Sequence, residues 1–378
     1  MNRTQRNLAY QAAALLLVFG AVALVVATAS ANLADRGIEL GTEFLGDRAG
    51  FTLSESWLPY SPEDSNLWAI AAGIVNTLVI SLFVAFFATF IGTGLGILRL
   101  SENALAKSFA RSWVEIARNS PPILLLLFLY SFLGQVLPVA DVVEPIQGVY
   151  LSLRGLAIPA LDLQGMGWSV TGGVLLTLIG IGSVAKATAS RQRETGLCPP
   201  WVKWAIAASA LLWLLIIVLL LAPSASVELP KANGPDIVGG FILSPEFFTL
   251  ITGLTFYTSG FVAEIVRTGL QSVTRGQWEA AYALGLSRGR TLRLVVIPQM
   301  LRVIIPPMTS QYINIVKNST LVIAIGYADF MVVTGTVINK TSHAIEGTVI
   351  IIAVYLAINL SLSALMNQVN RRVQQGVG

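Results

Sequence analysis

The stretch from Leu67 to Leu98, LWAIAAGIVNTLVISLFVAFFATFIGTGLGIL, decides the fold class of this 378-residue chain. It contains no Asp, Glu, Lys or Arg, and it is longer than the roughly 20 apolar residues that a helix needs to cross a bilayer. Similar apolar stretches recur, because 54% of the chain is hydrophobic and only 12% is charged, whereas a soluble domain is about 25% charged. The sequence therefore predicts an all-α polytopic membrane protein.

We expect about eight membrane-spanning helices. They are Leu8 to Ala29, Leu67 to Leu98, Ser120 to Val139, Trp168 to Ala185, Trp204 to Ala222, Phe247 to Val266, Pro307 to Tyr327 and Gly347 to Met366. The first can also be interpreted as a signal peptide, because Arg3 and Arg6 precede it and small residues follow it. Its apolar run exceeds the roughly 7 to 15 residues of a signal peptide, which favours a retained span.

The basic residues segregate by side of the membrane. Of the 24, only Arg36, Arg48, Arg154, Lys231 and Lys340 fall on one side of the expected spans, and acidic residues gather there, above all in residues 30–66. Because cytoplasmic loops retain positive charge, we expect both termini in the cytoplasm of a multi-pass protein. A net charge of +4 that is divided in this way indicates membrane lipid, and not nucleic acid, as the partner.

Composition divides the chain into four parts. Residues 1–66 hold one expected span and an acidic external loop, residues 67–140 two spans, residues 141–246 two spans between polar, proline-containing connections, and residues 247–378 three spans. Prolines in the outer connections of residues 141–246 are expected to prevent helices there.

A polar stretch on the cytoplasmic side runs from Gln271 to Pro307 and reads QSVTRGQWEAAYALGLSRGRTLRLVVIPQMLRVIIPP. Its segment Gln277 to Leu284 is rich in helix formers and has Glu279 in the expected first turn, where the helix dipole favours an acid. Gly285 is expected to end this helix in the left-handed conformation.

A second short helix is expected after that glycine. Ser287 can cap it, its arginines face water, and Pro298 ends it. The loop of residues 271–306 should therefore form two short helices at an angle, hinged at Gly285.

Glu279-Ala280-Ala281, Gly285 after three further residues, and Ile297-Pro298 resemble the EAA loop of ATP-binding-cassette (ABC) importer permeases. The surrounding sequence resembles the polar amino-acid uptake branch, in particular the general L-amino-acid permease subunits, over about residues 73–133 and 255–370. The resemblance implies a type I ABC importer permease fold with five core spans, beginning near residues 67, 120, 247, 307 and 347. The coupling residues that it implies are Gln277, Trp278, Glu279, Ala280, Ala281, Gly285, Ser287 and Pro298.

The chain is not expected to hydrolyse ATP itself. ATP hydrolysis of the P-loop kind requires a Gly-Lys-Ser/Thr phosphate cradle, and the chain contains no Gly-Lys dipeptide. The resemblance implies an ABC ATPase dimer that uses ATP and Mg, a second permease subunit, and a periplasmic or extracellular amino-acid-binding protein, at the bacterial inner (plasma) membrane. No cofactor is expected on this chain. A merely solvated amphipathic loop is the alternative interpretation of residues 271–306.

Polar groups at membrane depth are costly unless they are paired or face a wet cavity, so we take those in the spans as pathway candidates. Glu264 can instead pair with Arg267 across one helix turn, and the other polar groups can bond neighbouring helices. These candidates are Asn76, Thr77, Glu264, Lys317, Asn318, Ser319 and Thr320. The family resemblance adds the apolar Leu125, which stands at a commonly polar position of the branch.

Two of these positions depart from the resembling branch. Leu125 stands where glutamine is common, and Asn318 stands where Asp usually follows the lysine. At these two positions the expected substrate pathway therefore lacks a carboxylate that could select a substrate with a cationic side chain. We expect either recognition of the ammonium and carboxylate groups common to many amino acids, or a weaker half of a heterodimer with a paralogous permease.

The predicted function is that of a transport subunit, not an enzyme: the permease of a binding-protein-dependent ABC importer for L-amino acids, working by alternating access. An ion-coupled secondary carrier is the alternative, and it needs intramembrane acids, of which only Glu264 is available. A membrane-embedded enzyme is disfavoured because no span carries paired carboxylates, a metal-ligand cluster or a nucleophile beside a base.

Overall fold

The computed structural model describes residues 41–136, 143–152, 155–162, 226–233 and 236–375, with five helical residues between Leu17 and Thr28. The chain forms two compact units, one of Met1–Ser131 with Thr249–Gly378 and one of Phe132–Phe248. The predicted spans over residues 168–185 and 204–222, and nearly all of the span over residues 8–29, lie outside the described residues.

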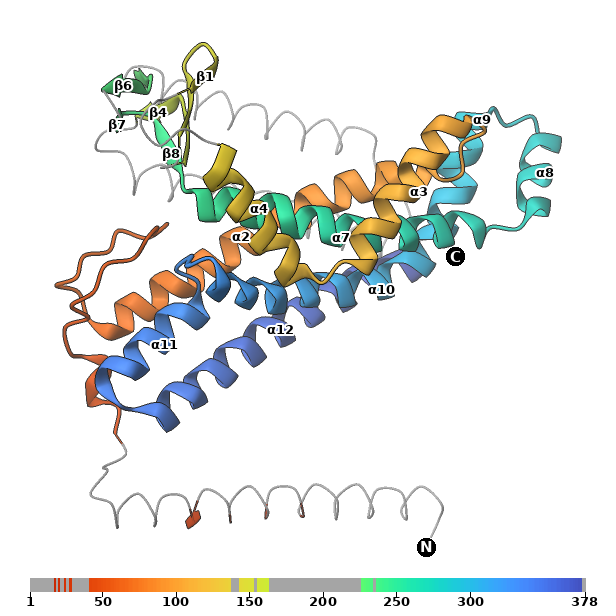
Figure 1. Cartoon of the computed structure of the whole chain (residues 1–378). Coiled ribbons are helices and arrows are strands. Elements are labelled where there is room, and N and C mark those ends of the chain that lie inside the picture. The colour runs from red at the N-terminus through yellow and green to blue at the C-terminus, as the bar shows by residue number, and fades with distance from the viewer. Residues whose placement is uncertain are drawn as a thin grey trace, which may run out of the picture. The chain divides into compact units, whose positions relative to one another are not determined.

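The described part of the first unit is helical (Figure 1). In chain order the elements are η1 (Glu43–Leu45), α2 (Asn66–Leu98), α3 (Ala104–Asn119), α4 (Pro122–Val136), α7 (Pro245–Gln271), α8 (Arg275–Ala283), α9 (Arg288–Thr291), the π-helical η2 (Leu292–Val296), α10 (Ile297–Asn318), the 3-10 helix η3 (Ser319–Ala324), α11 (Phe330–Thr341) and α12 (Ala344–Gln375).

Four described stretches are long and apolar enough to cross a membrane: α2, α7, the run Arg288–Ala324, and α12. Helices α3 and α4 pass the same test only together, as a pair bent by 106°. These five stretches cover the predicted spans that begin near residues 67, 120, 247, 307 and 347. The predicted all-α membrane class is confirmed for most of the described chain.

Two glycines fix the contact between α2 and α7. A Cβ atom added at Gly92 would lie 2.6 Å from Cβ of Val262, and one added at Gly96 would lie 2.8 Å from the carbonyl oxygen of Ala263. Small residues four positions apart let membrane helices approach closely at their backbones. Any side chain at Gly92 or Gly96 must push the two helices apart.

The helix that follows Gly285 differs from the prediction. Pro298 does not end it, because α9, η2 and α10 continue as one run from Arg288 to Ala324. The π-helical turn Leu292–Val296 lies directly before this proline, and such a turn changes the hydrogen-bond register where proline has no N–H to donate. The predicted stop at Pro298 is wrong, and the span predicted from Pro307 begins earlier.

The second unit contains strands where only helix-free connections were expected. Strands β1 (Val143–Ile146), β2 (Val149–Ser152), β3 (Gly155–Ile158) and β8 (Phe241–Leu243) form an antiparallel sheet in that order, while β4 (Ala160–Asp162) pairs with β5 (Ser226–Glu228) and β6 (Lys231–Asn233) with β7 (Asp236–Val238). A strand of three or four residues is too short to show the alternating pattern from which strands are predicted.

Residues 41–65 belong to the loop that was predicted to be external, and we call them the outer segment. The amide of Asn66 donates to the carbonyl oxygen of Phe44 (2.7 Å), and the Lys340 ammonium donates to that of Arg48 (2.8 Å). The ring of Phe44 stacks on His343 with a centroid distance of 4.5 Å. Lys340 belongs to α11, a helix of 12 residues that was not predicted because it is too short to be a span.

Candidate functional site

Helix α8 ends in a Schellman motif, as the position of Gly285 predicted. Gly285 has φ of +74°, its N–H donates to the carbonyl oxygen of Tyr282 (2.9 Å), and the N–H of Leu286 donates to that of Ala281 (3.1 Å). These two bonds satisfy carbonyl groups at the helix end. The start differs from the prediction: α8 begins at Arg275, so Glu279 lies in the second turn, 3.4 Å from the Arg275 guanidinium.

Helix α8 projects from the others (Figure 1) and carries exposed apolar groups at its end. Leu284 is 81% exposed and Tyr282 is 47% exposed, while Ala281 is buried. Trp278 is half-buried, and its ring lies 6.4 Å from that of Tyr282. Glu279 and Ala280 are exposed beside them. This end of the protein therefore combines exposed aromatic and aliphatic groups with a charge, a composition suited to a protein contact.

Side-chain bonds connect α8 to the membrane helices. The amide of Gln299, in the first turn of α10, donates to the Gln277 side-chain oxygen (3.0 Å). Ser287 is the N-cap residue of α9, but its side chain makes no capping hydrogen bond. Its backbone carbonyl accepts from the N–H of Thr291 (2.8 Å). Helix α8 is therefore connected to α10 through Gln277 and through the short α9.

Glu264 lies at the centre of a cluster of guanidinium groups. Arg267 pairs with it across one turn of α7, with Nε donating to Oε1 at 3.2 Å, as the sequence indicated. Arg99 at the end of α2 also bonds it, and Arg118 of α3 lies 3.9 Å away. The two latter arginines were missed, because a partner far away in the sequence leaves no local signal. One carboxylate thereby joins α2, α3 and α7.

Asn76 and Thr77 bond the backbone of other segments. Both side chains are fully buried. The Asn76 amide donates to the carbonyl oxygens of Ala328 (2.7 Å) and Glu55 (2.9 Å), and the Thr77 hydroxyl accepts from the N–H of Phe330 (3.0 Å). We call these bonds the outer clamp, because they hold the outer segment and the start of α11 to α2. They are the contacts expected if these side chains hold neighbouring segments.

The polar group at the end of α10 is more open. Lys317 is exposed and Asn318 is half-buried. Ser319 is buried and donates to the carbonyl oxygen of Val316 (2.9 Å), while Thr320 donates to that of Lys317 (2.7 Å). The two hydroxyl groups thus donate to carbonyl oxygens of the same helical run, whereas the Lys317 side chain is exposed.

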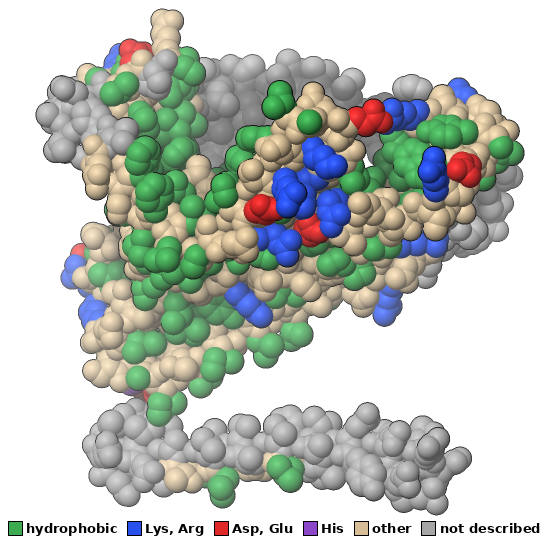
Figure 2. All heavy atoms as spheres, turned by 45° about the vertical axis from the view of Figure 1, so that its right-hand side comes forward, with side chains coloured by type: hydrophobic (Ala, Val, Ile, Leu, Met, Phe, Trp, Pro, Cys, Tyr) green, Lys and Arg blue, Asp and Glu red, His purple; other side chains and the backbone are tan. Residues whose placement is uncertain are grey.

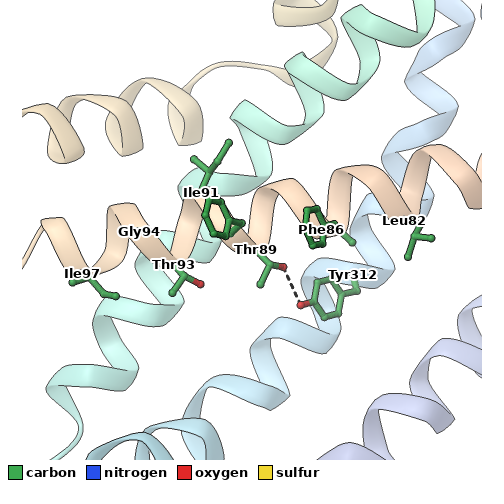
Figure 3. A pocket seen from close by; sticks show the side chains of 10 residues that line it. Leu82, Phe86, Thr89, Ile91, Thr93, Gly94, Ile97 and Tyr312 are labelled. Carbon is green, nitrogen blue, oxygen red and sulfur yellow. Dashed lines mark hydrogen bonds between the residues drawn. The ribbon is translucent and has the colours of Figure 1, made fainter. Parts of the chain in front are cut away.

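Three hollows of the described chain lie along α2. One, about 790 Å³, is lined mainly by α2, and Tyr312 of α10 contributes the hydroxyl that hydrogen-bonds Thr89 (3.0 Å; Figure 3). A second, about 640 Å³, lies between α2, α10 and α12 and is lined by Tyr312 and Val316. A third, about 550 Å³, is lined by Leu125 together with residues of α2, α3 and α7. The structure therefore does not bring Leu125 into the same hollow as Tyr312, nor to the Lys317 segment.

The chain is similar to known transport proteins over most of its length. Residues 198–375 match the family of binding-protein-dependent transport system inner membrane components. The general L-amino acid transport system permease protein of Rhizobium johnstonii is 38% identical, covering 97% of this chain and 92% of its own length.

Two further relatives are similar over nearly the whole chain. A putative amino-acid ABC transporter permease protein of Escherichia coli is 39% identical, with 98% of this chain and 95% of the relative covered. The glutamate/glutamine/aspartate/asparagine transport system permease protein of Rhodobacter capsulatus is 34% identical, with 98% and 94% covered. This chain belongs to the family of inner-membrane permease components of binding-protein-dependent ABC transport systems.

Proposed function

We propose that this chain is the permease subunit of an importer for L-amino acids, and that α8 docks into a groove on a separate ABC ATPase dimer. The observation that carries the proposal is the exposed apolar surface of Tyr282 and Leu284 on a helix that Gly285 ends. A short amphipathic helix that inserts into a groove is a common mode of protein recognition. ATP and Mg then belong to the partner, and this chain supplies the moving spans.

The connection from α8 to the membrane suggests how the motion is passed on. Closing of the ATPase pushes α8, and the push reaches α10 through Gln277 and Gln299. Because Arg288–Ala324 is one continuous helical run, movement at its inner end shifts Lys317 and Asn318 near its outer end. Alternating access follows if that shift opens one side of the pathway while it closes the other.

Amino acids are the substrate class that the relatives support, since their names refer to amino-acid transport. In this proposal Lys317 and Asn318 line the pathway, with Ser319 and Thr320 shaping the helix beside them, and a binding protein delivers the substrate on the side of the outer segment. A paralogous permease completes the pathway. Leu125 and Asn318 supply no carboxylate, so this subunit does not select cationic side chains by charge.

Coupling is tested in the reconstituted complex with ATPase and binding protein. Glu279→Ala should abolish ATP-driven uptake, because the partner loses the carboxylate that its basic groups bind. Arg275→Ala is the matched control, since it breaks the same exposed Arg275–Glu279 pair but leaves the carboxylate in place, and it should retain most uptake. Normal uptake by Glu279→Ala would contradict the proposed docking role.

Orientation is tested by labelling. With Cys198→Ser as background, a cysteine at the exposed Ser54 of the outer segment should react with an impermeant maleimide added outside the cell. A cysteine that replaces the exposed Ser287 should react only after the membrane is permeabilised. The reverse pattern would invert the proposed topology, in which both termini are cytoplasmic.

The secondary-carrier alternative is not favoured. Such a carrier needs an intramembrane acid that takes up and releases the coupling ion. Within the four described spans, Glu264 is engaged by arginines, and the other acids, Glu246 and Glu346, lie in the first turns of α7 and α12. To bind at Glu264, the coupling ion would therefore have to displace an arginine.

A further inference from the structure

Helix α3 has three distinct sides. Ala110, Val114 and Ala117 are buried against α2 and α7, with Val114 and Ala110 packed on Leu95 and Ala263. A second side bears the basic residues Lys107, Arg111 and Arg118. The third side is apolar and uncovered in the described chain, with Leu105 83% exposed and Phe109 and Ile116 each 57% exposed. We call Leu105, Phe109 and Ile116 the apolar stripe of α3.

The bend at its end indicates how α3 runs relative to the membrane. α3 and α4 meet at 106°, and α4 is strongly apolar whereas α3 alternates apolar and charged residues. If α4 crosses the bilayer, α3 must therefore run close to the membrane plane. A helix with basic residues on one side and Leu, Phe and Ile on another is typical of segments that lie in the interface.

Two neighbouring features fix the depth of α3. On its charged side, Arg118 approaches Glu264, which also holds Arg99 at the end of the spanning helix α2. On its apolar side, the ring of Phe109 lies 5.9 Å from that of Trp113, and Trp113 lines the apolar hollow that also contains Leu125. The helix thus lies between a charged layer and an apolar layer, as a segment at the headgroup level does.

The charge on this helix favours an anionic surface. Lys107, Arg111 and Arg118 are opposed within the helix only by Glu115, which pairs with Arg111 at 2.7 Å. Figure 2 shows Lys and Arg side chains gathered, with a few acids, in the middle of this face of the molecule. Basic residues next to an interfacial helix attract anionic lipids.

We infer that α3 lies in the membrane leaflet on the α8 side, with its apolar stripe among the acyl chains and with Lys107 and Arg111 bound to anionic phospholipid headgroups. Because the opposite side of α3 packs on α2 and α7, the lipid surface supports the contact around Glu264. This role adds a lipid requirement to the transport subunit.

Depth is measured by spin labelling the complex in nanodiscs, with Cys198→Ser as background. A label at Phe109→Cys should collide with oxygen far more than with a water-soluble nickel complex. The matched control is Ser108→Cys, the neighbouring exposed position on the polar side, where the label should collide more often with the nickel complex than with oxygen. Equal nickel access at both positions would place the stripe in water, and exclusion of both reagents at Phe109 would mean that protein covers it. Either result overturns the inference.

Headgroup preference is measured with spin-labelled lipids in equal mixtures of phosphatidylcholine and phosphatidylglycerol. The double variant Lys107→Gln/Arg111→Gln should lower the preference of the protein for labelled phosphatidylglycerol by about twofold. Arg371→Gln/Arg372→Gln removes two exposed charges from the end of α12 and should leave most of the preference intact. Equal losses in both double variants, or no loss in either, would overturn the assignment of the headgroup site to α3.

Discussion

Helix α8 and the outer clamp use polar and aromatic residues in opposite ways. In the outer clamp, Asn76 and Thr77 are fully buried and their side chains bond backbone atoms of this same chain. In α8, Glu279, Tyr282 and Leu284 are exposed, and the helix is held mainly at its ends by Gln277 and Gly285. The difference indicates that the clamp is complete within this chain, whereas α8 is shaped for a partner.

The largest effect is expected at Gly285, where the backbone itself is tested. Its φ of +74° is in the left-handed region, and a Cβ atom there would meet nothing within 4 Å. A substitution therefore costs only backbone strain, about 1–2 kcal/mol for an ordinary residue and more for a β-branched one. Gly285→Val should abolish ATP-driven uptake while the chain still inserts in the membrane.

Gly285→Asn is the control for this change, because asparagine tolerates the left-handed conformation. It should retain most uptake in the same reconstituted complex. Equal uptake by the valine and asparagine variants would mean that the Schellman motif is not needed, and the contrast between α8 and the clamp would lose its basis.

Substitutions in the outer clamp should change the stability of the chain and not its coupling to ATP hydrolysis. Asn76→Ala removes bonds to Trp57, Glu55 and Ala328 and should destabilise the chain by about 3 kcal/mol, since each buried group left without its partner costs about 1–3 kcal/mol. Thr77→Val removes one bond at nearly constant volume and should cost about 1 kcal/mol. Thermal unfolding in detergent measures both, and a larger effect of Thr77→Val would contradict the ranking.

A smaller effect, dependent on pH, is expected beside the clamp at Asp329. This residue is fully buried, and its Oδ1 caps α11 by accepting from the N–H of Val332 (2.8 Å). Burial raises the pKa of the Asp329 carboxyl to about 7, against an ordinary value of 3.8. The folded state thus favours the protonated acid, so its contribution to stability is fully present below about pH 4 and is lost as pH rises to about 7.

Asp329→Asn keeps a good N-cap residue but cannot ionise. The melting temperature of the variant relative to the parent should therefore rise between pH 5 and pH 8 by a few degrees, as expected for roughly 1 kcal/mol or more. A difference that stays constant over this range would show that the carboxyl does not titrate there.

The smallest effect is expected between the two regions, at Asn318, which follows the exposed Lys317 at the end of α10. Asn318→Asp introduces a carboxylate at the proposed pathway, and it should raise uptake of cationic amino acids relative to neutral ones. Competition between arginine, glutamine and glutamate in the intact complex measures this. An unchanged profile would remove Asn318 from the substrate pathway.

Local patterns determined what the sequence could predict. The membrane class follows from long apolar stretches such as α2, the end of α8 follows from the conformational freedom of Gly285, and the Glu264–Arg267 pair follows from the spacing of one helix turn. Each of these depends on residues within a few positions of one another. Such signals are visible in the sequence because helix geometry alone brings the groups together.

Only the tertiary structure decided which distant groups meet. Asn76 bonds Ala328, Arg99 pairs with Glu264, and Lys340 bonds the backbone of Arg48, because the packing of separate segments brings these groups together. The continuation of the helix through Pro298 likewise depends on a π-helical turn that lets the proline fit without a stop. Sequence spacing predicts contacts within one helix, but contacts between helices depend on how closely their surfaces fit, as Gly92 and Gly96 do for α2 and α7.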